Sequence, residues 1–380
     1  MGNLFQAAKQ WSTRPADQRF WTIEEMAQAV REHKESARQA LVKNNTLRIA
    51  ATDNDNLAIV GEAGIPATLT NWSFNQLCNR LGAPAGYLAK LPRELVSANL
   101  EHGLRNDNEG ETNLLIHRNG STVCRALTSD QYARIWNYDI CETLQRAAQS
   151  GWRVPPARPA GKENEVTRIA TEADCVRSGH PVLGIKPGDL IAPAGLYASD
   201  HDMFAFMVND ENRLNDGSEG GLSRGFFVSN SEVGANALKI VKFLYRHVCG
   251  NHIVWDASEV EELRIVHRGE NDLRYESRMI RSMREYANSS AIADQSRIDS
   301  ARRLEIADSR DKVINTIFAS RVLSKAVAES AYNRAEQDNE NPRSKWGFVQ
   351  GVTALSQETQ FADKRNELDR AAGKILSMAF

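Results

Sequence analysis

The sequence predicts an α+β protein in which an antiparallel β-sheet with flanking helices is followed by a mostly helical C-terminal region. Three observations predict this class. Apolar and aromatic runs of strand length fill much of residues 203–267, which indicates neighbouring strands. The dipeptide Asn119-Gly120, which tolerates the positive φ angles of a tight turn, separates two further strand-like runs. After Gly269 the chain is polar, alanine-rich and helical in spacing.

The chain is long enough for more than one folding unit, because single hydrophobic cores usually stop growing at about 250–300 residues. For its 380 residues we expect an N-terminal α+β region over 1–150, an antiparallel sheet region over 151–270 and a helical C-terminal region over 271–380. Prolines and glycines gather between 151 and 188. This composition indicates a loop-rich crossing between the first two regions.

The N-terminal region contains predicted helices and hairpins. Thr22, followed three residues later by Glu25, is typical of a capping box and begins a helix expected over 23–41. Further helices are expected over 72–81, from Pro92 to an exit at Gly103, and over 129–148. The runs TLRIAA and NLAIVG predict one hairpin, and NLLIHRNGSTVCRAL predicts a second.

The sheet region and the helical region follow. The runs DMFAFMVND, RGFFVSN, ALKIVKFLYRHVC and HIVWD predict at least four antiparallel strands, joined by ELRIVH. Two or three helices are expected over 272–335, followed by a break at QDNENPRS. A last helix is expected from Phe348 to Met378.

Bulk properties limit the class of partner and the compartment. A formal net charge of −2 gives no general reason to expect a nucleic-acid or membrane partner, so any polyanion must be bound by a local patch. The five cysteines are odd in number and far apart, and the N-terminus lacks a signal-peptide pattern, so we expect a reduced cytoplasmic protein. No run approaches 18 apolar residues, so we expect no membrane partner.

The stretch LYRHVCGNHIVWD brings His247, Cys249 and His252 close together in sequence. A turn at Gly250-Asn251 would place the three side chains near one another, which leaves a metal site open as one interpretation. A structural zinc site needs four ligands, however, and only one incomplete ligand pair is present. The other interpretation is a buried cysteine at the end of a strand.

Arginines form the second candidate site. Arg274, Arg278 and Arg281 lie at i, i+4 and i+7 and so share one face of a predicted helix. We expect this stripe, with Arg264 and Arg268 just upstream, to contact phosphates of a nucleic-acid backbone. The alternative is a solvated face whose arginines pair with Glu276 and Glu285 along the helix.

Other patterns give less specific information about function. Phe204, Phe206, Phe226, Phe227 and Tyr245 fall on predicted strands and could stack unpaired bases if exposed, although aromatic residues at this spacing normally form a core. The chain contains no phosphate-binding loop, dinucleotide fingerprint, zinc-protease motif or nucleophile elbow. We therefore expect a non-enzymatic protein without a cofactor.

Part of the chain resembles a known family. The series SRGFFVSNSEVGANALKIVKFLYRHVCGNHIVWD, followed by RIVHRG, is similar to the core of the phage- and plasmid-borne proteins labelled "phage/plasmid-like protein", a family of unknown function. The positions that fit its pattern are Asn230-Ser231, Glu232, Gly234, Cys249, Asn251 and His267-Arg268, whereas His252 stands where the pattern has glycine. LTSDQYARIWNYDI and KWGFVQGVTAL also look like family segments. The resemblance covers about residues 70–380, with its specific part within 225–268.

The resemblance implies a protein of a mobile element, and some members look distantly similar to ring-forming single-strand annealing proteins. From the arginines and this resemblance together we expect a DNA-binding protein of a phage, prophage or plasmid that acts on single-stranded DNA in annealing or recombination and forms a homo-oligomer. The alternative is a structural or host-interaction protein of such an element that does not bind nucleic acid.

Overall fold

The computed structural model describes residues 16–52, 56–161, 166–177, 180–182, 184–218, 220–247, 251–254, 263–267, 275–359 and 362–380. Its centre is a large antiparallel sheet with the strand order β1-β14-β15-β16-β17-β18, in which β8 also pairs with β15 and β19 with β17. These strands are β1 (Arg19–Phe20), β8 (Trp152–Arg153), β14 (Leu196–Ala198), β15 (Met203–Leu214), β16 (Leu222–Asn230), β17 (Leu238–Arg246), β18 (Asn251–Val254) and β19 (Leu263–Ile265). The predicted α+β class and antiparallel sheet are confirmed.

Both faces of this sheet are buried, as the continuous apolar runs require. Along β16 every residue is buried, and alternate side chains enter different clusters. Phe226 and Val228 belong to the main core, whereas Phe227 belongs to a separate aromatic cluster on the other face. Gly225 pairs with Phe243 across the strands and leaves room for the aromatic ring.

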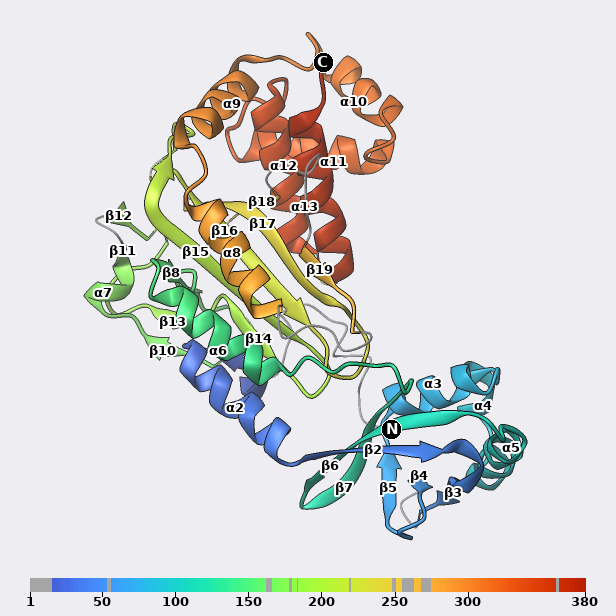
Figure 1. Ribbon diagram of the computed structural model, residues 1–380. Helices are drawn as coiled ribbons and strands as arrows, with labels where there is room; N and C mark the ends of the chain where they lie inside the picture. Colours follow the sequence, from blue (N-terminus) through green and yellow to red (C-terminus); the bar gives the residue numbers. More distant parts are fainter. Residues whose placement is uncertain are drawn as a thin grey trace.

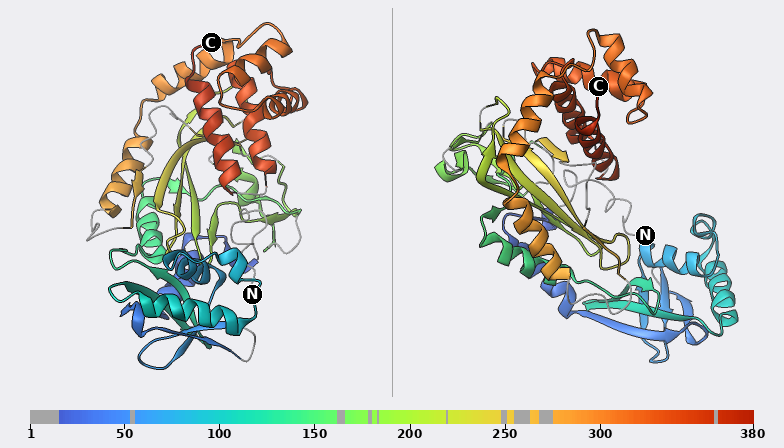
Figure 2. Two further views of the ribbon diagram at one scale, coloured as in Figure 1. Left: turned by 90° about the vertical axis from the view of Figure 1, so that its right-hand side faces the viewer. Right: turned by 45° about the horizontal axis from the view of Figure 1, so that its top comes forward.

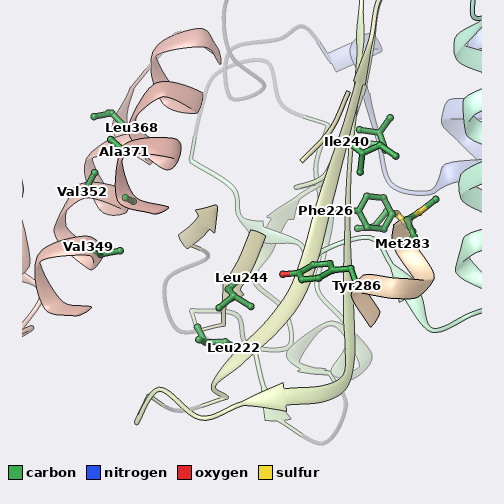
Figure 3. Close-up of a cluster of buried hydrophobic side chains, with 14 of the residues drawn as sticks. Leu222, Phe226, Ile240, Leu244, Met283, Tyr286, Val349, Val352, Leu368 and Ala371 are labelled. Carbon is green, nitrogen blue, oxygen red and sulfur yellow. The ribbon is translucent and has the colours of Figure 1, made fainter. Parts of the chain in front are cut away.

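Three helices, α2 (Ile23–Glu35), α6 (Asn137–Ala148) and α8 (Tyr275–Ala287), lie side by side over one face of the large sheet (Figure 1). Figure 3 shows Phe226 and Ile240 beside Met283 of α8, with Val349 of the C-terminal helices in the same cluster. The hydroxyl of Thr22 accepts the first-turn hydrogen bond of α2, as predicted.

Two of the wrongly predicted helix boundaries share one cause. The helix expected up to Leu41 ends at Glu35, and β2 (Ala37–Lys43) follows because its backbone pairs along its length with β6 (Glu111–Asn119). Residues 129–136 are not helical, and α6 begins at Asn137, whose N–H is bound by a carboxylate distant in sequence rather than by a local cap. In both cases a long-range contact overrides local helix propensity.

The N-terminal region forms its own mixed sheet, with the order β2-β6-β7-β5-β4-β3 (Figure 1). Its other strands are β3 (Arg48–Ala51), β4 (Leu57–Val60), β5 (Pro66–Leu69) and β7 (Ser121–Thr128), and its helices are α3 (Asn71–Arg80), α4 (Ala85–Leu88) and α5 (Arg93–Asn106). Both predicted hairpins are present. Gly103 does not end its helix as expected but lies inside α5, where a Cβ would come within 3.1 Å of Leu81.

The C-terminal region is helical, as predicted (Figures 1 and 2). It contains more helices than expected. The helices after α8 are α9 (Ala291–Arg303), α10 (Arg310–Ala319), α11 (Lys325–Gln337), α12 (Lys345–Glu358) and α13 (Ala362–Ser377). The predicted break at QDNENPRS lies between α11 and α12, with Asn339 in a left-handed conformation (φ 59°). The single last helix that we expected is thus divided into α12 and α13.

Short elements connect these parts. Strands β9 (Arg158–Pro159), β10 (Arg168–Ile169) and β13 (Leu190–Ala192) form a small sheet, and β11 (Val176–Arg177) pairs with β12 (His180–Pro181) beside the one-turn helix α7 (Glu172–Cys175). The main hydrophobic cluster contains residues from all three predicted regions, so this core does not separate them. The region boundaries at 150 and 270 stay predictions. Among the described residues, no helix combines the length and the hydropathy needed to cross a membrane.

Candidate nucleic-acid interface and a buried polar junction

Helix α8 packs one face on the large sheet and turns its arginines outward. Tyr275, Met279 and Met283 are buried, whereas Arg278 and Arg281 are exposed. This division follows the helical period, because residues three or four apart share a face. Two of the predicted phosphate contacts therefore lie together on an accessible surface.

The other three predicted arginines are less completely defined. Arg264 lies in β19, opposite Lys239 in the strand register, and β19 contacts α8. The side chain of Arg264 is not among those described, and Arg268 and Arg274 lie outside the described residues. The structure thus brings the backbone of Arg264 near the helix that carries Arg278 and Arg281.

Two of the four acidic residues of α8 and α9 pair with arginines from other elements. Glu276 forms an ion pair with Arg146 of α6 at 2.5 Å, and Asp294 forms one with the buried Arg224 of β16 at 2.5 Å. No ion pair between Glu285 and an arginine is present within the part of the chain that the structure describes. For Glu276, the pairing with Arg146 of another helix differs from the pairing along α8 that the alternative interpretation predicts.

The outer surface of α8 and α9 is basic as a result. Of the four acidic residues over 275–303, Glu285 is exposed, Glu276 and Asp299 are half-buried, and Asp294 is buried. The exposed arginines over the same range are Arg278, Arg281, Arg284, Arg297, Arg302 and Arg303, which we call the α8–α9 arginine surface. Arg284 was not among the predicted contacts, although it follows Arg281 by three residues.

The strand aromatics do not form a base-stacking platform. Phe204, Phe206, Phe227 and Tyr245 belong to one buried cluster, and each is less than 10% exposed. Phe226 is 1% exposed in the main core. The structure thus favours the interpretation that these side chains stabilise the fold.

The side chain of His247 contacts a polar cluster formed by Ser223 and Asp210. The hydroxyl of Ser223 donates to Asp210 Oδ1 at 2.6 Å and lies 2.7 Å from His247 Nε2. Because the proton of the serine is directed to Asp210, the imidazole is not placed to remove it as a general base would. Ser223 is also fully buried, so we interpret this cluster as a clamp across adjacent strands.

The metal interpretation gains no support from the described residues. Cys249 lies outside them, and His252 pairs with Tyr245 in the sheet although its side chain is not described. Within the described ranges, no group of three or more histidine, cysteine, aspartate or glutamate side chains could hold a metal ion.

A buried polar junction forms where β16 ends. Asn230 donates from Nδ2 to the carbonyl oxygen of Ile135 at 3.0 Å and to Asn137 Oδ1 at 2.8 Å, and its Oδ1 lies 3.0 Å from His267 Nε2. The N–H of Ile135 donates to His267 Nδ1 at 3.3 Å. Burial, and to a lesser extent the nearby charge of Arg134, lower the pKa of His267 to about 4.

The second half of this junction is a buried ion pair. Arg125 lies at a β-bulge between β6 and β7, where it is the extra residue that lets its side chain leave the sheet. Its guanidinium lies 3.1 Å from Glu232 Oε2, and both side chains are at most 3% exposed. The other oxygen of Glu232 accepts the N–H of Asn137 at 2.9 Å and so fixes the start of α6.

The junction also holds the N-terminal sheet. The carbonyl oxygen of Val233 accepts hydrogen bonds from Trp72 Nε1 and Gln76 Nε2, both at 2.8 Å, and Gln76 Oε1 accepts from the N–H of Leu127 at 2.9 Å. Residues 230–234, with Gly234 at φ +82°, thus tie together the two sheets and α6. In the sequence these residues stand out only through a family resemblance, and their spacing does not predict the contact between His267 and Asn230.

A scan against protein-family models, a search of curated proteins and a search of solved structures each found no match for this chain.

Proposed function

We propose that this chain is a non-enzymatic protein of a phage, prophage or plasmid that binds single-stranded DNA through the α8–α9 arginine surface. The observation that carries the proposal is the separation of charge on these helices: Glu276 and Asp294 pair with arginines of other elements, whereas the exposed face is rich in arginine. Such a surface binds phosphates without reading the sequence of bases. A role in annealing or recombination rests on the resemblance described above.

The test is fluorescence anisotropy with a labelled single-stranded oligonucleotide at several salt concentrations. The variant carries Arg278→Ala, Arg281→Ala and Arg284→Ala, and a matched control carries Lys43→Ala, Lys90→Ala and Arg118→Ala, three exposed cations of the N-terminal region. Each phosphate contact on a single strand contributes a slope of about −0.7 to log K against log salt, so we expect the variant to lose about 2 units of slope.

The control should keep the slope of the wild type, because it changes net charge equally but leaves α8 intact. Circular dichroism and thermal unfolding should show that both triple variants remain folded. Undetectable binding by the wild type at low salt, or equal affinity of the α8 variant and the wild type, would overturn the proposal.

Self-association is a second part of the proposal. Strand β2 forms an edge of the N-terminal sheet and pairs with β6 on one side, with no second partner strand among the described residues. Leu41 on this strand is 55% exposed. A seven-residue edge strand can pair with another copy of the chain. Light scattering should give a mass above that of the monomer, and Leu41→Lys should lower it.

One observation favours the alternative of a protein partner. Ile292, in the first turn of α9, is 85% exposed and stands beside the arginine surface. An acidic protein with an apolar anchor would use both features. The test is affinity capture of a protein by the wild type and by Ile292→Ser. If the variant loses the captured protein and the wild type does not bind the oligonucleotide, the host-interaction function is supported and DNA binding is rejected.

A further inference from the structure

A cavity of about 400 Å³ lies between the edge of the large sheet and the small β9–β10–β13 sheet. Its lining includes Phe20 of β1, Trp21 directly after β1, Arg153 of β8, and Arg168 of β10. Its volume falls within the range of about 300–1,000 Å³ that is typical of small-molecule sites. The cavity is formed by elements other than α8 and α9.

The cavity has rigid walls. Pro155 and Pro193 line it and are buried, and a Cβ at Gly195 would lie only 2.8 Å from Pro155, so the strand edge approaches this wall closely. Proline fixes φ and supplies no N–H, so the backbone of these wall residues has little conformational freedom. A site of this kind loses little conformational freedom when a ligand binds.

Arg168 is a fixed part of the cavity wall rather than a free cation. Its guanidinium stacks 4.5 Å from the ring of Trp21 and donates to both carboxylate oxygens of Asp174, at 2.7 and 2.5 Å. Asp174 also accepts from the N–H and the hydroxyl of Thr171, both at 2.8 Å. The charges of Arg168 and Asp174 thus compensate each other, and the stacking fixes the indole ring.

Arg153 supplies the uncompensated charge. Its side chain is exposed at the cavity, and its guanidinium forms no hydrogen bond or ion pair among the described residues, although its backbone pairs with β15. Its positive charge is also close enough to Arg213 to lower the pKa of that residue, in addition to the larger effect of burial. Because Arg168 compensates Asp174, the charge of Arg153 gives the described lining of the cavity a net positive charge, which favours an anion.

We propose that this cavity binds the 5′-phosphate end of a nucleotide, with the base against Trp21, Phe20 and the prolines and the phosphate on Arg153. Every base has a π-face that stacks on an aromatic ring, so we expect little preference among bases. The ligand is either a free nucleoside 5′-monophosphate or the 5′-terminal nucleotide of a strand. The site does not depend on the α8–α9 arginine surface.

Isothermal titration calorimetry of the full chain tests this proposal with three probes: a nucleoside 5′-monophosphate, the corresponding nucleoside and inorganic phosphate. We expect the monophosphate to bind at least about tenfold more tightly than either part, because ring and phosphate are bound together. Arg153→Ala should remove this advantage, and Arg153→Lys should retain part of it. Ala173→Phe, which fills the cavity from α7, should weaken the monophosphate and the nucleoside alike.

Arg118→Ala, an exposed arginine outside the cavity, is the matched control and should leave all three affinities unchanged. Oligonucleotides that carry a 5′-phosphate or a 5′-hydroxyl distinguish a free nucleotide from a strand end as the ligand. If the site binds strand ends, the oligonucleotide with the 5′-phosphate should bind more tightly than the one with the 5′-hydroxyl. No saturable binding of the monophosphate, or binding that neither Arg153→Ala nor Ala173→Phe weakens, would overturn the proposal. These outcomes are independent of the salt slope that tests the arginine surface.

Discussion

His267 donates a hydrogen bond from Nε2 to Oδ1 of Asn230 at 3.0 Å, and this direction follows from the surrounding groups. The amide nitrogen of Asn230 is directed to the carbonyl of Ile135 and to Asn137, so its oxygen faces the imidazole. The N–H of Ile135 points at Nδ1 of His267, which must accept. The imidazole is therefore neutral, with its proton on Nε2.

Replacing Asn230 by alanine should strongly destabilise the protein. The substitution leaves the Nε2 proton of His267 and the carbonyl of Ile135 buried without partners, and each such group costs about 1–3 kcal/mol. We expect Asn230→Ala to lower the free energy of unfolding by about 2–4 kcal/mol, measured by urea denaturation. In a double-mutant cycle, the double variant with His267→Ala should lose less stability than the two single variants lose in sum. A loss equal to that sum would contradict the contact.

The neutral state of His267 also predicts a dependence of stability on pH. Its pKa is lowered from the ordinary value of 6.5 to about 4, so between these two pH values the unfolded chain binds a proton that the folded chain does not. The free energy of unfolding should thus fall as the pH drops from about 6.5 to 4, by on the order of 3 kcal/mol from this group.

His267→Gln removes the titrating group but retains a side-chain donor, so the variant should lose stability less steeply over the same interval. A smaller slope should remain in the variant, because burial also lowers the pKa of His33 and His117. The measurement is urea unfolding at a series of pH values. Equal slopes for the variant and the wild type would show that His267 is not neutral in the folded state.

The fold was more predictable than the junction, for physical reasons. Hairpins such as the one around Asn119-Gly120 depend on local turn chemistry, which a single sequence displays. The start of α6 at Asn137 depends on Glu232, which is 95 residues away, and no local pattern reports such a contact. The arginine stripe was visible because helical spacing is local, whereas the engagement of Glu276 by another helix was not.

Glu232 should be essential for stability because its partner is buried. Glu232→Gln keeps an oxygen for the N–H of Asn137 but leaves the charge of Arg125 without its carboxylate. We expect a loss of about 3–5 kcal/mol in the free energy of unfolding, as for other broken buried ion pairs. The double variant Arg125→Met/Glu232→Gln removes the unpaired charge as well and should recover much of this loss. A single-variant effect below about 1 kcal/mol would mean that the pair behaves as a surface ion pair.

Gly225 should resist substitution because it lies under an aromatic ring. A Cβ at this position would overlap the ring of Phe243, its partner in the register, and the strand interior leaves neither residue room to shift. We expect Gly225→Ala to lower the free energy of unfolding by about 1–3 kcal/mol, the usual effect of overpacking. Gly61→Ala is the matched control, since nothing lies within 4 Å of a Cβ there. Phe243→Leu should partly rescue Gly225→Ala by removing ring atoms, and the lack of any rescue would place the strain in the backbone instead of at the ring.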